Sequence, residues 1–428
     1  MELKREDFII QYPPINHMSR TEVKDLWEKE VLHLYVHIPF CIRKCGFCYY
    51  KSDIAGRRGV PDEYVAALKK EIRTYALKPE VQCRKIRSVY FGGGTPTLLN
   101  EAQLESLLEV LMSSFTFAPD FEFCSEARPG EETTLTKLEL LKSFGLNRLS
   151  LGCQSLDENV LKANKCNHGV KEFYRVFEEA RRTGIRTINT DLLSGMVNDT
   201  AGSFMNTIEG IIALKPENVS IYKMEVYLNT DLYKKLREGD IRLISDDCDT
   251  DFVRKAYNRL LNAGYLQADH FSFMTTPEHD HVQRRGQWYG EDMLGFGASS
   301  YSRFNSFMFQ NESRIGNYME KIMGGETAII RAHRVSQKEK MAQRLVLGLK
   351  NLRVDRIKFR KDFGVEVMDI FPDQLKMMEE EGFITITEEL ITSTFEGALF
   401  ADDIAREFYL PEHKVMMLGH ASRSLLAV

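Results

Sequence analysis

Three cysteines stand close together early in the chain, in the stretch CIRKCGFCYY that covers residues 41–50. Cys41, Cys45 and Cys48 follow one another with three and then two residues between them. Three thiolates on one short loop can hold three corners of a cubane iron–sulfur cluster, whose full complement would be four cysteines. One iron would then stay open to another ligand. Zinc is less suitable, because structural zinc sites are four-coordinate and the sequence offers no second Cys or His pair at a finger-like spacing.

The other cysteines do not extend this cluster. Eight cysteines in 428 residues is not the density of a disulfide-stabilised scaffold, and three within eight residues suggest a metal or catalytic site in a reducing compartment. Each of the others is expected to be a small buried residue, because free cysteine is among the most buried residue types. These are Cys83, Cys124, Cys153, Cys166 and Cys248.

The charges of the chain are nearly balanced. Lys and Arg number 57 and Asp and Glu 62, a net charge of −5, so no basic field favours nucleic acid. The chain has no apolar run of about 20 residues, and its start, MELKREDFIIQYPP, resembles neither a signal peptide nor a membrane span. We therefore expect a cytoplasmic protein with a small-molecule substrate, no membrane span and no nucleic-acid partner.

Short apolar segments alternate with segments of helical periodicity from about residue 33 onward, which indicates βα units and a parallel sheet. Helical periodicity is clear in residues 61–77, 101–115 and 202–214. Six such units predict an α/β fold with a barrel-like sheet that stays partly open, in which ligands bind at the carboxyl ends of the strands. The expected strands are residues 34–38, 87–92, 121–127, 148–154, 187–193 and 219–227.

The alternation weakens after about residue 245, and residues 265–305 are expected to be rich in loops. Short helices follow, and GFITITEELITSTFEGALF predicts a β-hairpin. Four parts are therefore expected. They are an N-terminal extension (1–33), a partial barrel (34–245), a connecting region with a Gly and aromatic loop (246–334), and a mostly helical accessory domain with a small β wing and a tail (335–428).

Polar residues stand at the strand ends, where the fold would place a ligand. GGGTPT, residues 92–97, would let the backbone approach a ligand without hindrance from Cβ atoms, although a tight strand-to-helix turn explains the glycines equally well. Glu126, Arg128, Gln154 and Asp191 lie at or near the ends of later strands. Burying such side chains without partners is costly, so ligand contact and an internal polar network both remain open.

The stretch YVHIPFCIRKCGFC, residues 35–48, together with GGGTPT, resembles the motifs of radical S-adenosylmethionine (radical SAM) enzymes. The resemblance is to the branch that contains the oxygen-independent coproporphyrinogen dehydrogenases, and it runs from about residue 33 to residue 408. It implies a partial (β/α)6 barrel and a [4Fe-4S] cluster on the three cysteines, with S-adenosylmethionine chelating the open iron. An electron from a donor such as flavodoxin or ferredoxin would split the sulfonium, releasing methionine and a 5′-deoxyadenosyl radical.

The same resemblance implies a set of residues around the cofactor. Glu126, Gln154 and Asp191 would bind S-adenosylmethionine, Asp191 through the ribose hydroxyls. Tyr35 would lie near the cofactor and Phe47 would border the adenine. The glycine-rich run would contribute Gly93, Gly94 and Thr95.

One position departs from the family pattern. Cys166 stands where relatives commonly carry an arginine, twelve residues after Gln154. An arginine offers a fixed fork for a carboxylate, and a thiol cannot replace it. Lys165 would substitute only if the end of the preceding helix shifted.

The motifs that vary within the branch predict the reaction. Tyr50 stands where the coproporphyrinogen dehydrogenases carry a further cysteine, and residues 283–302 lack the His-Asn pair before Tyr-Trp that haem chaperones usually show. CYY and RGQWYG look more like the methyltransferase and cyclopropanase members. We therefore predict a C-methyltransferase or cyclopropanase that holds two S-adenosylmethionine molecules. The radical from one would form a methylene radical on the other, which would add to an sp² carbon of a small substrate.

This reaction needs aromatic surfaces around the second sulfonium, because a cation over a π face is stabilised. Ordinary packing is the alternative explanation for such residues, and for His168 and His270 a structural role is the simpler one. Tyr50, Trp288 and Glu225 are the predicted catalytic residues, with Glu225 serving the second cofactor or a proton transfer. The candidate aromatic walls are Tyr49, Tyr50, Trp288, Tyr289 and Tyr301.

Two alternatives stay open. A coproporphyrinogen III dehydrogenase, or another radical enzyme of tetrapyrroles, would need cations for several carboxylates, and Arg284, Arg285 and Arg303 could serve. A haem chaperone, which binds rather than transforms its ligand, is the alternative from a different class.

Overall fold

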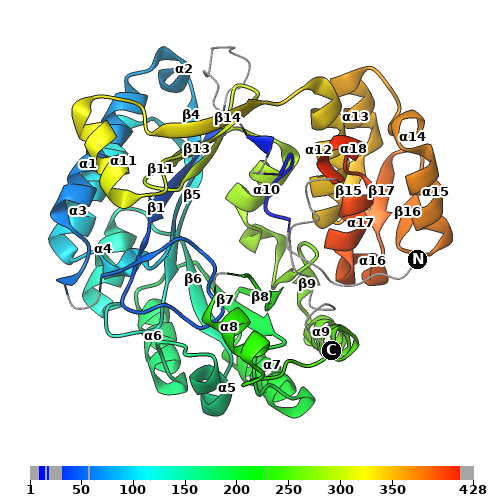
Figure 1. Ribbon diagram of the computed structural model, residues 1–428, viewed down its shortest axis with the longest axis horizontal. Coiled ribbons are helices and arrows are strands. Elements are labelled where there is room, and N and C mark those ends of the chain that lie inside the picture. Colours follow the sequence, from blue (N-terminus) through cyan, green and yellow to red (C-terminus); the bar gives the residue numbers. More distant parts are fainter. Residues whose placement is uncertain (1–8, 15–16, 19–30, 56–57, 229, 415–428) are drawn as a thin grey trace.

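The structure is a computed structural model, and it describes residues 9–14, 17–18, 31–55, 58–228 and 230–414. Parts of the predicted N-terminal extension and of the predicted tail lie outside these residues. A large sheet forms the centre, helices cover its outer face, and a mostly helical region packs against one side (Figure 1). The sequence predicted this α/β fold with a partial barrel and a helical C-terminal region.

The six predicted strands form one parallel run within the sheet, each paired with the next in the chain. Alternate residues of the first strand, from Leu32 to Ile38, are fully buried against the outer helices. The sixth strand is shorter than predicted and ends at Lys223. The strands are β1 (Val31–Ile38), β4 (Lys85–Gly93), β5 (Phe117–Ala127), β6 (Arg148–Gln154), β7 (Thr187–Ser194) and β8 (Asn218–Lys223).

Helices that follow these strands pack on the outside of the sheet (Figure 1). In α3 the buried residues Leu104, Leu107, Leu108 and Leu111 recur at helical spacing, and Asn100 caps the first turn by accepting from Gln103 N. No helix in the described part of the chain has the length and apolar character needed to cross a bilayer. The helices of this part of the chain are α1 (Asp62–Ala76), α2 (Pro79–Gln82), α3 (Glu101–Ser114), α4 (Leu135–Ser143), α5 (Glu158–Ala163), α6 (Val170–Arg182), α7 (Ala201–Leu214), α8 (Asp231–Glu238) and α9 (Asp246–Asn262), of which α8 lies beside the cysteine loop.

Residues 265–305 are not loop-rich, and this expectation was wrong. They contain short strands that join the main sheet, which reaches twelve strands among the described residues. β11 pairs in parallel with β1, on the edge opposite to β4, and these strands are too short for their side-chain period to show in the sequence. The added elements, to the end of the sheet, are β9 (Leu266–Gln267), β10 (Ser272–Met274), α10 (Val282–Tyr289), β11 (Met293–Phe296), β12 (Tyr301–Phe304), β13 (Phe307–Asn311), α11 (Ile315–Gly324) and β14 (Ile329–Arg334).

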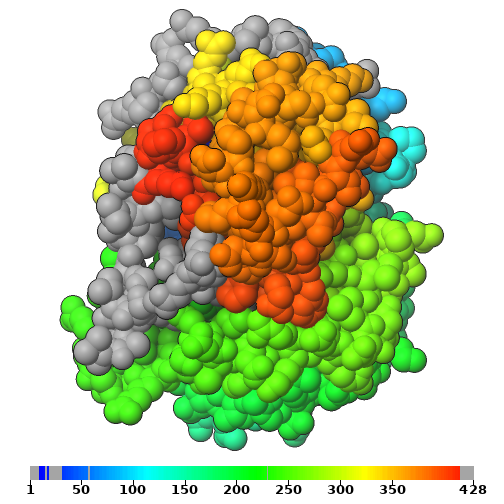
Figure 2. Space-filling model, turned by 90° about the vertical axis from the view of Figure 1, so that its right-hand side faces the viewer, coloured from blue at the N-terminus to red at the C-terminus, as the bar shows by residue number. Residues whose placement is uncertain are grey.

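The C-terminal region has its own apolar core and covers one side of the barrel (Figure 2). The predicted hairpin is confirmed as β16 and β17, and β15 extends it. Buried Lys350 joins this region to the N-terminal segment, since Nζ donates to Ile9 O at 2.6 Å and to Asp402 Oδ1 at 2.5 Å. Its elements are α12 (Gln337–Lys350), β15 (Arg353–Asp355), α13 (Arg356–Phe363), α14 (Val367–Ile370), α15 (Pro372–Glu380), β16 (Ile384–Ile386), β17 (Leu390–Ser393), α16 (Phe395–Leu399), α17 (Ala401–Glu407) and α18 (Pro411–Lys414).

Short elements at the carboxyl ends of the strands shape the loops there. The cysteine stretch begins in β2 (Phe40–Cys41), which pairs with β3 (Asp53–Ile54). The glycine-rich run leads into a 3₁₀ turn, Pro96–Leu98, and a second such turn, Pro277–His279, precedes α10.

Candidate cofactor site and active site

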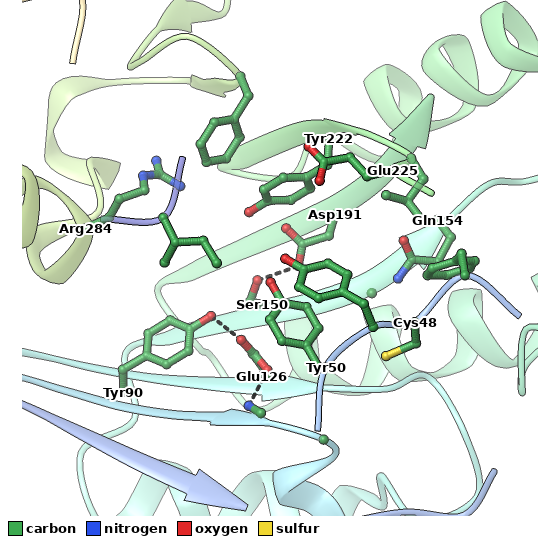
Figure 3. A pocket seen from close by; sticks show the side chains of 18 of the residues that line it. Cys48, Tyr50, Tyr90, Glu126, Ser150, Gln154, Asp191, Tyr222, Glu225 and Arg284 are labelled. Atoms are coloured by element: carbon green, nitrogen blue, oxygen red, sulfur yellow. Dashed lines mark hydrogen bonds between the residues drawn. The ribbon is translucent and has the colours of Figure 1, made fainter. Parts of the chain in front are cut away.

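A cavity of about 890 Å³ opens at the carboxyl ends of the barrel strands. Its position agrees with the rule that ligands bind at this edge of parallel βα folds. Figure 3 shows several of its side chains, which come from different strands and point toward one another. All of the predicted metal, cofactor and catalytic residues line it: Cys41, Cys45, Cys48, Tyr35, Phe47, Gly93, Gly94, Thr95, Glu126, Gln154, Asp191, Tyr50, Glu225 and Trp288.

The cysteine loop is held by the chain segments beside it. Gly46 N donates to Asn164 O and Gly46 O accepts from Leu232 N, both at 2.9 Å. Thr95 Oγ1 donates to Cys41 Sγ at 3.6 Å. Burial raises the pKa of Cys48 to about 11, while a hydrogen bond from Cys166 lowers the pKa of Cys45. The three partly exposed thiols therefore share one wall of the cavity but differ in their surroundings.

Glu126 ties the glycine-rich run to strand β5. Its carboxylate accepts from Tyr90 Oη at 2.7 Å and from Gly93 N at 3.0 Å (Figure 3). Burial raises the pKa of this carboxyl to about 7, because desolvation outweighs both hydrogen bonds. The Glu126 carboxyl can therefore change its protonation state, or accept a further hydrogen bond, when a ligand enters.

Asp191 belongs to a polar network that crosses three strands. It accepts from Ser150 Oγ at 2.7 Å and from Asn189 Nδ2 at 2.8 Å, and Asn189 in turn accepts from Ser220 at 3.0 Å. Burial raises the pKa of Asp191 to about 6. The network orients the carboxylate, which still lines the cavity. Asp191 can therefore belong to the internal polar network and still contact a ligand.

Gln154 has a strained backbone at the end of β6. Its φ is +65°, in the left-handed region that non-glycine residues adopt at a cost, and the β6–β7 register shifts between Gly152 and Gln154. The bulge turns this side chain into the cavity. Strain of this kind tends to persist at functional sites, where the surrounding structure fixes it.

The glycines of GGGTPT are required by packing in the turn. A Cβ on Gly93 would lie 2.5 Å from the His37 ring, and one on Gly94 would lie 2.5 Å from Phe40 O. Gly93 also has a φ of +110°. The tight turn that the sequence left open therefore explains the glycines, and it brings the backbone of Gly93 and Gly94 to the cavity wall.

The structure shows what surrounds the position of the missing arginine. Lys165 points away, because its Nζ pairs with Asp231 at 2.8 Å. Arg128 lines the cavity and reaches this segment, where Nη1 donates to the carbonyl of Asn167, next to Cys166. Its Nη2 is paired with Glu132. A guanidinium is therefore present here, but it comes from the end of β5.

Two groups of aromatic residues form walls of the cavity. Tyr50 is 48% exposed and stacks on Tyr49, which stacks on Tyr227, with ring centroids 4.4 and 3.9 Å apart. Trp288 is buried, with its ring centroid 6.0 Å from that of Phe271. Trp288 thus combines packing with a place in the cavity wall, and Tyr50 presents its ring to the cavity.

The other candidates are divided between the cavity and its surroundings. Tyr301, His168, His270 and Arg284 line the cavity. Tyr289 lies elsewhere and accepts from Arg353 Nε at 3.4 Å. Arg285 pairs with Asp280, and Arg303 donates to Gln287 O at 3.3 Å. Of the three arginines suggested for substrate carboxylates, only Arg284 is in position.

Several residues of the cavity wall were not predicted. Asn189 precedes Asp191 by two, and Ser150 and Gly152 precede Gln154 at the same spacing, so the period of two along a strand would have found them. Nothing in the sequence brings residues of the N-terminal segment and of α16 and α17 to this edge. The unpredicted residues include Ile10, Gln11, Tyr90, Ser150, Asn189, Tyr222, Leu399, Phe400 and Asp402.

Comparison with known proteins identifies the fold. Residues 35–211 match the family model of the radical SAM superfamily. The solved structure of coproporphyrinogen III oxidase (HemN) from Escherichia coli superposes with a TM-score of 0.81 at 24% identity, over 94% of this chain and 96% of that one. The chain has the radical SAM fold. This fold family implies a [4Fe-4S] cluster and S-adenosylmethionine.

Curated relatives match this chain over most of its length. The heme chaperone HemW of Bacillus subtilis is 28% identical over 378 residues, 87% of this chain and 98% of its own length. An oxygen-independent coproporphyrinogen III oxidase of Pseudomonas aeruginosa is 29% identical over 403 residues, 89% of this chain and 86% of its own length. The corresponding E. coli oxidase is 28% identical over 392 residues, 88% of this chain and 85% of its own length.

These relatives correct the predicted reaction. The methyltransferase or cyclopropanase reading was wrong, because the chain matches proteins named as coproporphyrinogen III oxidases and heme chaperones nearly end to end. That prediction relied on CYY and on RGQWYG, and in the first of these Tyr49 and Tyr50 stack to make a flat wall. Such a wall suits any flat or cationic ligand, so the tyrosine pair does not specify the reaction.

The residues present fit the implied cofactors. Three thiols on one loop meet the ligand preference of an iron–sulfur cluster. Beside them, buried polar atoms of cavity residues have no hydrogen-bond partner among the described residues, as expected where a polar ligand binds. These atoms are His37 Nε2, Arg128 Nε and His168 Nδ1. Among the described residues, no three His, Cys, Asp or Glu side chains lie close enough together to hold a single metal ion.

Proposed function

We propose that this protein is a radical SAM enzyme that oxidises a propionate-bearing tetrapyrrole, in the manner of the coproporphyrinogen III dehydrogenases. The observation that carries the proposal is the shared cavity of about 890 Å³, which joins the three thiols to aromatic walls and to the cation Arg284. Near full-length similarity to enzymes named for that reaction supports it. The substrate is a small molecule, and with a net charge of −5 the chain has no basic field for nucleic acid.

The cofactors would occupy the thiol end of the cavity. Cys41, Cys45 and Cys48 would hold the cluster, with electrons from a donor such as flavodoxin or ferredoxin. When bound, the cluster and S-adenosylmethionine would supply a 5′-deoxyadenosyl radical to take a hydrogen atom from a substrate propionate, which would then lose CO₂ and pass one electron to an oxidised carrier of the flavodoxin or ferredoxin class, leaving a vinyl group. One S-adenosylmethionine molecule suffices for this reaction. The second molecule was needed only for methylene transfer, so it is no longer proposed.

The residues around the thiols would bind and orient S-adenosylmethionine. Ionised Asp191, held by Ser150 and Asn189, offers its remaining lone pairs to the ribose hydroxyls. Glu126 accepts from the amino group, and Arg128 takes the role of the missing arginine toward the carboxylate. The glycine-rich run, Gln154, Tyr35 and Phe47 complete the wall of this subsite.

The three predicted catalytic residues would act on the substrate side. Tyr50 presents a half-exposed ring against which a pyrrole can stack. Glu225 accepts from Tyr227 Oη at 2.5 Å and would hold or pass a proton. Trp288 carries Arg284 over its ring and closes that wall against water.

The test is an anaerobic assay of the reconstituted protein with dithionite, S-adenosylmethionine and coproporphyrinogen III. We expect 5′-deoxyadenosine and a vinyl-bearing product that has lost CO₂, both detected by mass spectrometry. A protein that holds the cluster and cleaves S-adenosylmethionine but leaves coproporphyrinogen III and related propionate tetrapyrroles unchanged would refute the proposal.

A haem chaperone is the second candidate, since HemW of B. subtilis is matched over 98% of its length. This function predicts stoichiometric binding of haem and its transfer to an acceptor protein, without cleavage of S-adenosylmethionine. Absorbance titration with haem, run beside the radical assay, separates the two functions.

A further inference from the structure

Arg284 is a charged side chain set into the wall of the cavity. It belongs to α10, which contacts both β4 of the barrel and α12 of the C-terminal region. Its side chain is 16% exposed, and its guanidinium carbon lies 4.8 Å from the ring centroid of Phe271 and 5.8 Å from that of Trp288. Aromatic surfaces stabilise a cation in this position and restrict its rotation.

One edge of the guanidinium is fixed by the protein. Nη2 lies 2.6 Å from Asp269 Oδ2 and donates to Ser272 Oγ at 2.7 Å. Asp269 is itself held, because it accepts from the backbone N–H groups of Phe271 and Ser272 at 3.0 Å. The ion pair therefore orients Arg284 and leaves it with further donors.

The two other nitrogens of the guanidinium are available to a ligand. Nη1 and Nε of Arg284 make no hydrogen bond to residues that the structure describes, and neither atom is buried from solvent. Figure 3 shows the guanidinium pointing into the pocket from the side opposite to Cys48, with Tyr222 and Asp191 between them. The side chain is thus a preorganised donor at the end of the cavity away from the thiols.

The other cations of the region are placed differently. Arg285, the next residue of the same helix, is paired with Asp280, and Lys223, which lines the cavity, lies 3.0 Å from Asp246. Arg128 stands at the thiol end, where the cofactor would bind. Among the residues that the structure describes, Arg284 is therefore the cation that a substrate would meet on the far wall.

We propose that Arg284 anchors a substrate carboxylate, a propionate of the tetrapyrrole if the proposed function holds, on which this inference rests. With Nη2 held by Asp269 and Ser272, Nη1 of Arg284 can donate a charge-assisted hydrogen bond to a carboxylate, which fixes the position of that group on this wall. Propionates are spread around a tetrapyrrole ring. A propionate held by Arg284 therefore anchors the tetrapyrrole ring in the cavity. A different propionate of the same ring then faces the thiol end.

The test measures porphyrin binding without turnover, by fluorescence titration of the cluster-loaded full-length protein under anaerobic conditions. The probes are coproporphyrin III, which has free carboxylates, and its tetramethyl ester in the same mild detergent. We expect Arg284→Gln to weaken coproporphyrin III binding about 10- to 100-fold, the usual effect of losing a charged hydrogen bond, and to leave the ester unaffected. Arg285→Gln, the matched control, should bind both probes like the wild type.

Three results would overturn the inference. Equal affinity of Arg284→Gln and wild type for coproporphyrin III would remove the anchor alone and leave the proposed function standing. Equal weakening toward both probes would make Arg284 a shaping residue of the wall. Failure of the wild type to bind coproporphyrin III would overturn the proposed function and the anchor together. Arg284→Lys keeps the charge and a donor and should give a smaller loss than Arg284→Gln, which controls for misfolding of the Gln variant.

Discussion

Replacement of Glu126 by glutamine should stabilise the cofactor-free protein at pH 8 and leave its stability at pH 5.5 nearly unchanged. Burial raises the pKa of this carboxyl to about 7 in the folded state. Between about pH 4.5 and 7 the folded protein therefore binds more protons than the unfolded chain, and the free energy of unfolding falls as pH rises through this window. Above pH 7 the ionised carboxylate is a full cost to the folded state, which glutamine avoids.

The size of the effect follows from the shift. A pKa raised from about 4.5 to about 7 corresponds to roughly 3 kcal/mol of destabilisation when the group is ionised. Glutamine can still accept from Gly93 N and donate to Tyr90 Oη, and we allow about 1 kcal/mol for weaker geometry. A chain of 428 residues has an unfolding entropy near 0.9 kcal/mol per kelvin, so the melting temperature at pH 8 should rise by about 2 °C.

Glu122→Gln is the matched control on the same strand. Burial alone would raise the pKa of Glu122, but Arg148 and His281 together lower it, with Arg148 Nε 2.7 Å from the carboxylate. Neutralising this partner leaves Arg148 buried without its carboxylate, so the melting temperature should fall by a few degrees at both pH values. Thermal unfolding by circular dichroism measures both variants. A loss of stability in Glu126→Gln at pH 8, comparable to that in Glu122→Gln, would refute the reasoning.

The remaining predictions concern the cofactors. Alanine at Cys41, Cys45 or Cys48 should abolish the iron–sulfur absorbance and bound iron, whereas Cys166→Ala should keep both; a cluster retained in any of the first three would contradict the ligand assignment. Asp191→Asn should weaken S-adenosylmethionine binding about tenfold in equilibrium dialysis. The wild-type affinity should also fall from pH 7 to pH 5.5, because the pKa of Asp191 is about 6 and its protonated form loses acceptor sites. The variant should show a weaker pH dependence over this range. Arg128→Gln should weaken the same binding without loss of the cluster, and Lys165→Ala, whose ammonium pairs with Asp231, should leave it unchanged.

The predicted reaction failed for a physical reason that the structure makes visible. The tyrosine pair, Tyr49 and Tyr50, predicts one-carbon transfer, but the structure shows a stack of rings that ends in a half-exposed tyrosine. A flat apolar surface with a hydroxyl at its edge binds many ligands. Two residues beside the cysteines therefore do not determine the substrate, which depends on the far wall of the cavity.

The sequence by itself determined the features that depend on local spacing. The cysteine spacing predicted a loop of three thiols, and the short-range alternation of apolar residues predicted six strands with polar residues at their ends. The strand period places Glu126, Gln154 and Asp191 on one edge because parallel strands end together. These residues therefore needed no knowledge of distant contacts.

Only the tertiary structure decided how the cavity is closed. β11 pairs with β1 although more than 250 residues separate them, and residues of α10, α16, α17 and the N-terminal segment reach the same cavity. Such contacts depend on how whole elements pack, and no periodicity in the chain encodes them. The orientation of Arg284 is set in this way, because its partner Asp269 and the rings beneath it belong to the junction between the barrel and the C-terminal region. The chemistry of the thiols could be read locally, whereas the groups that face the substrate come together only in the folded chain.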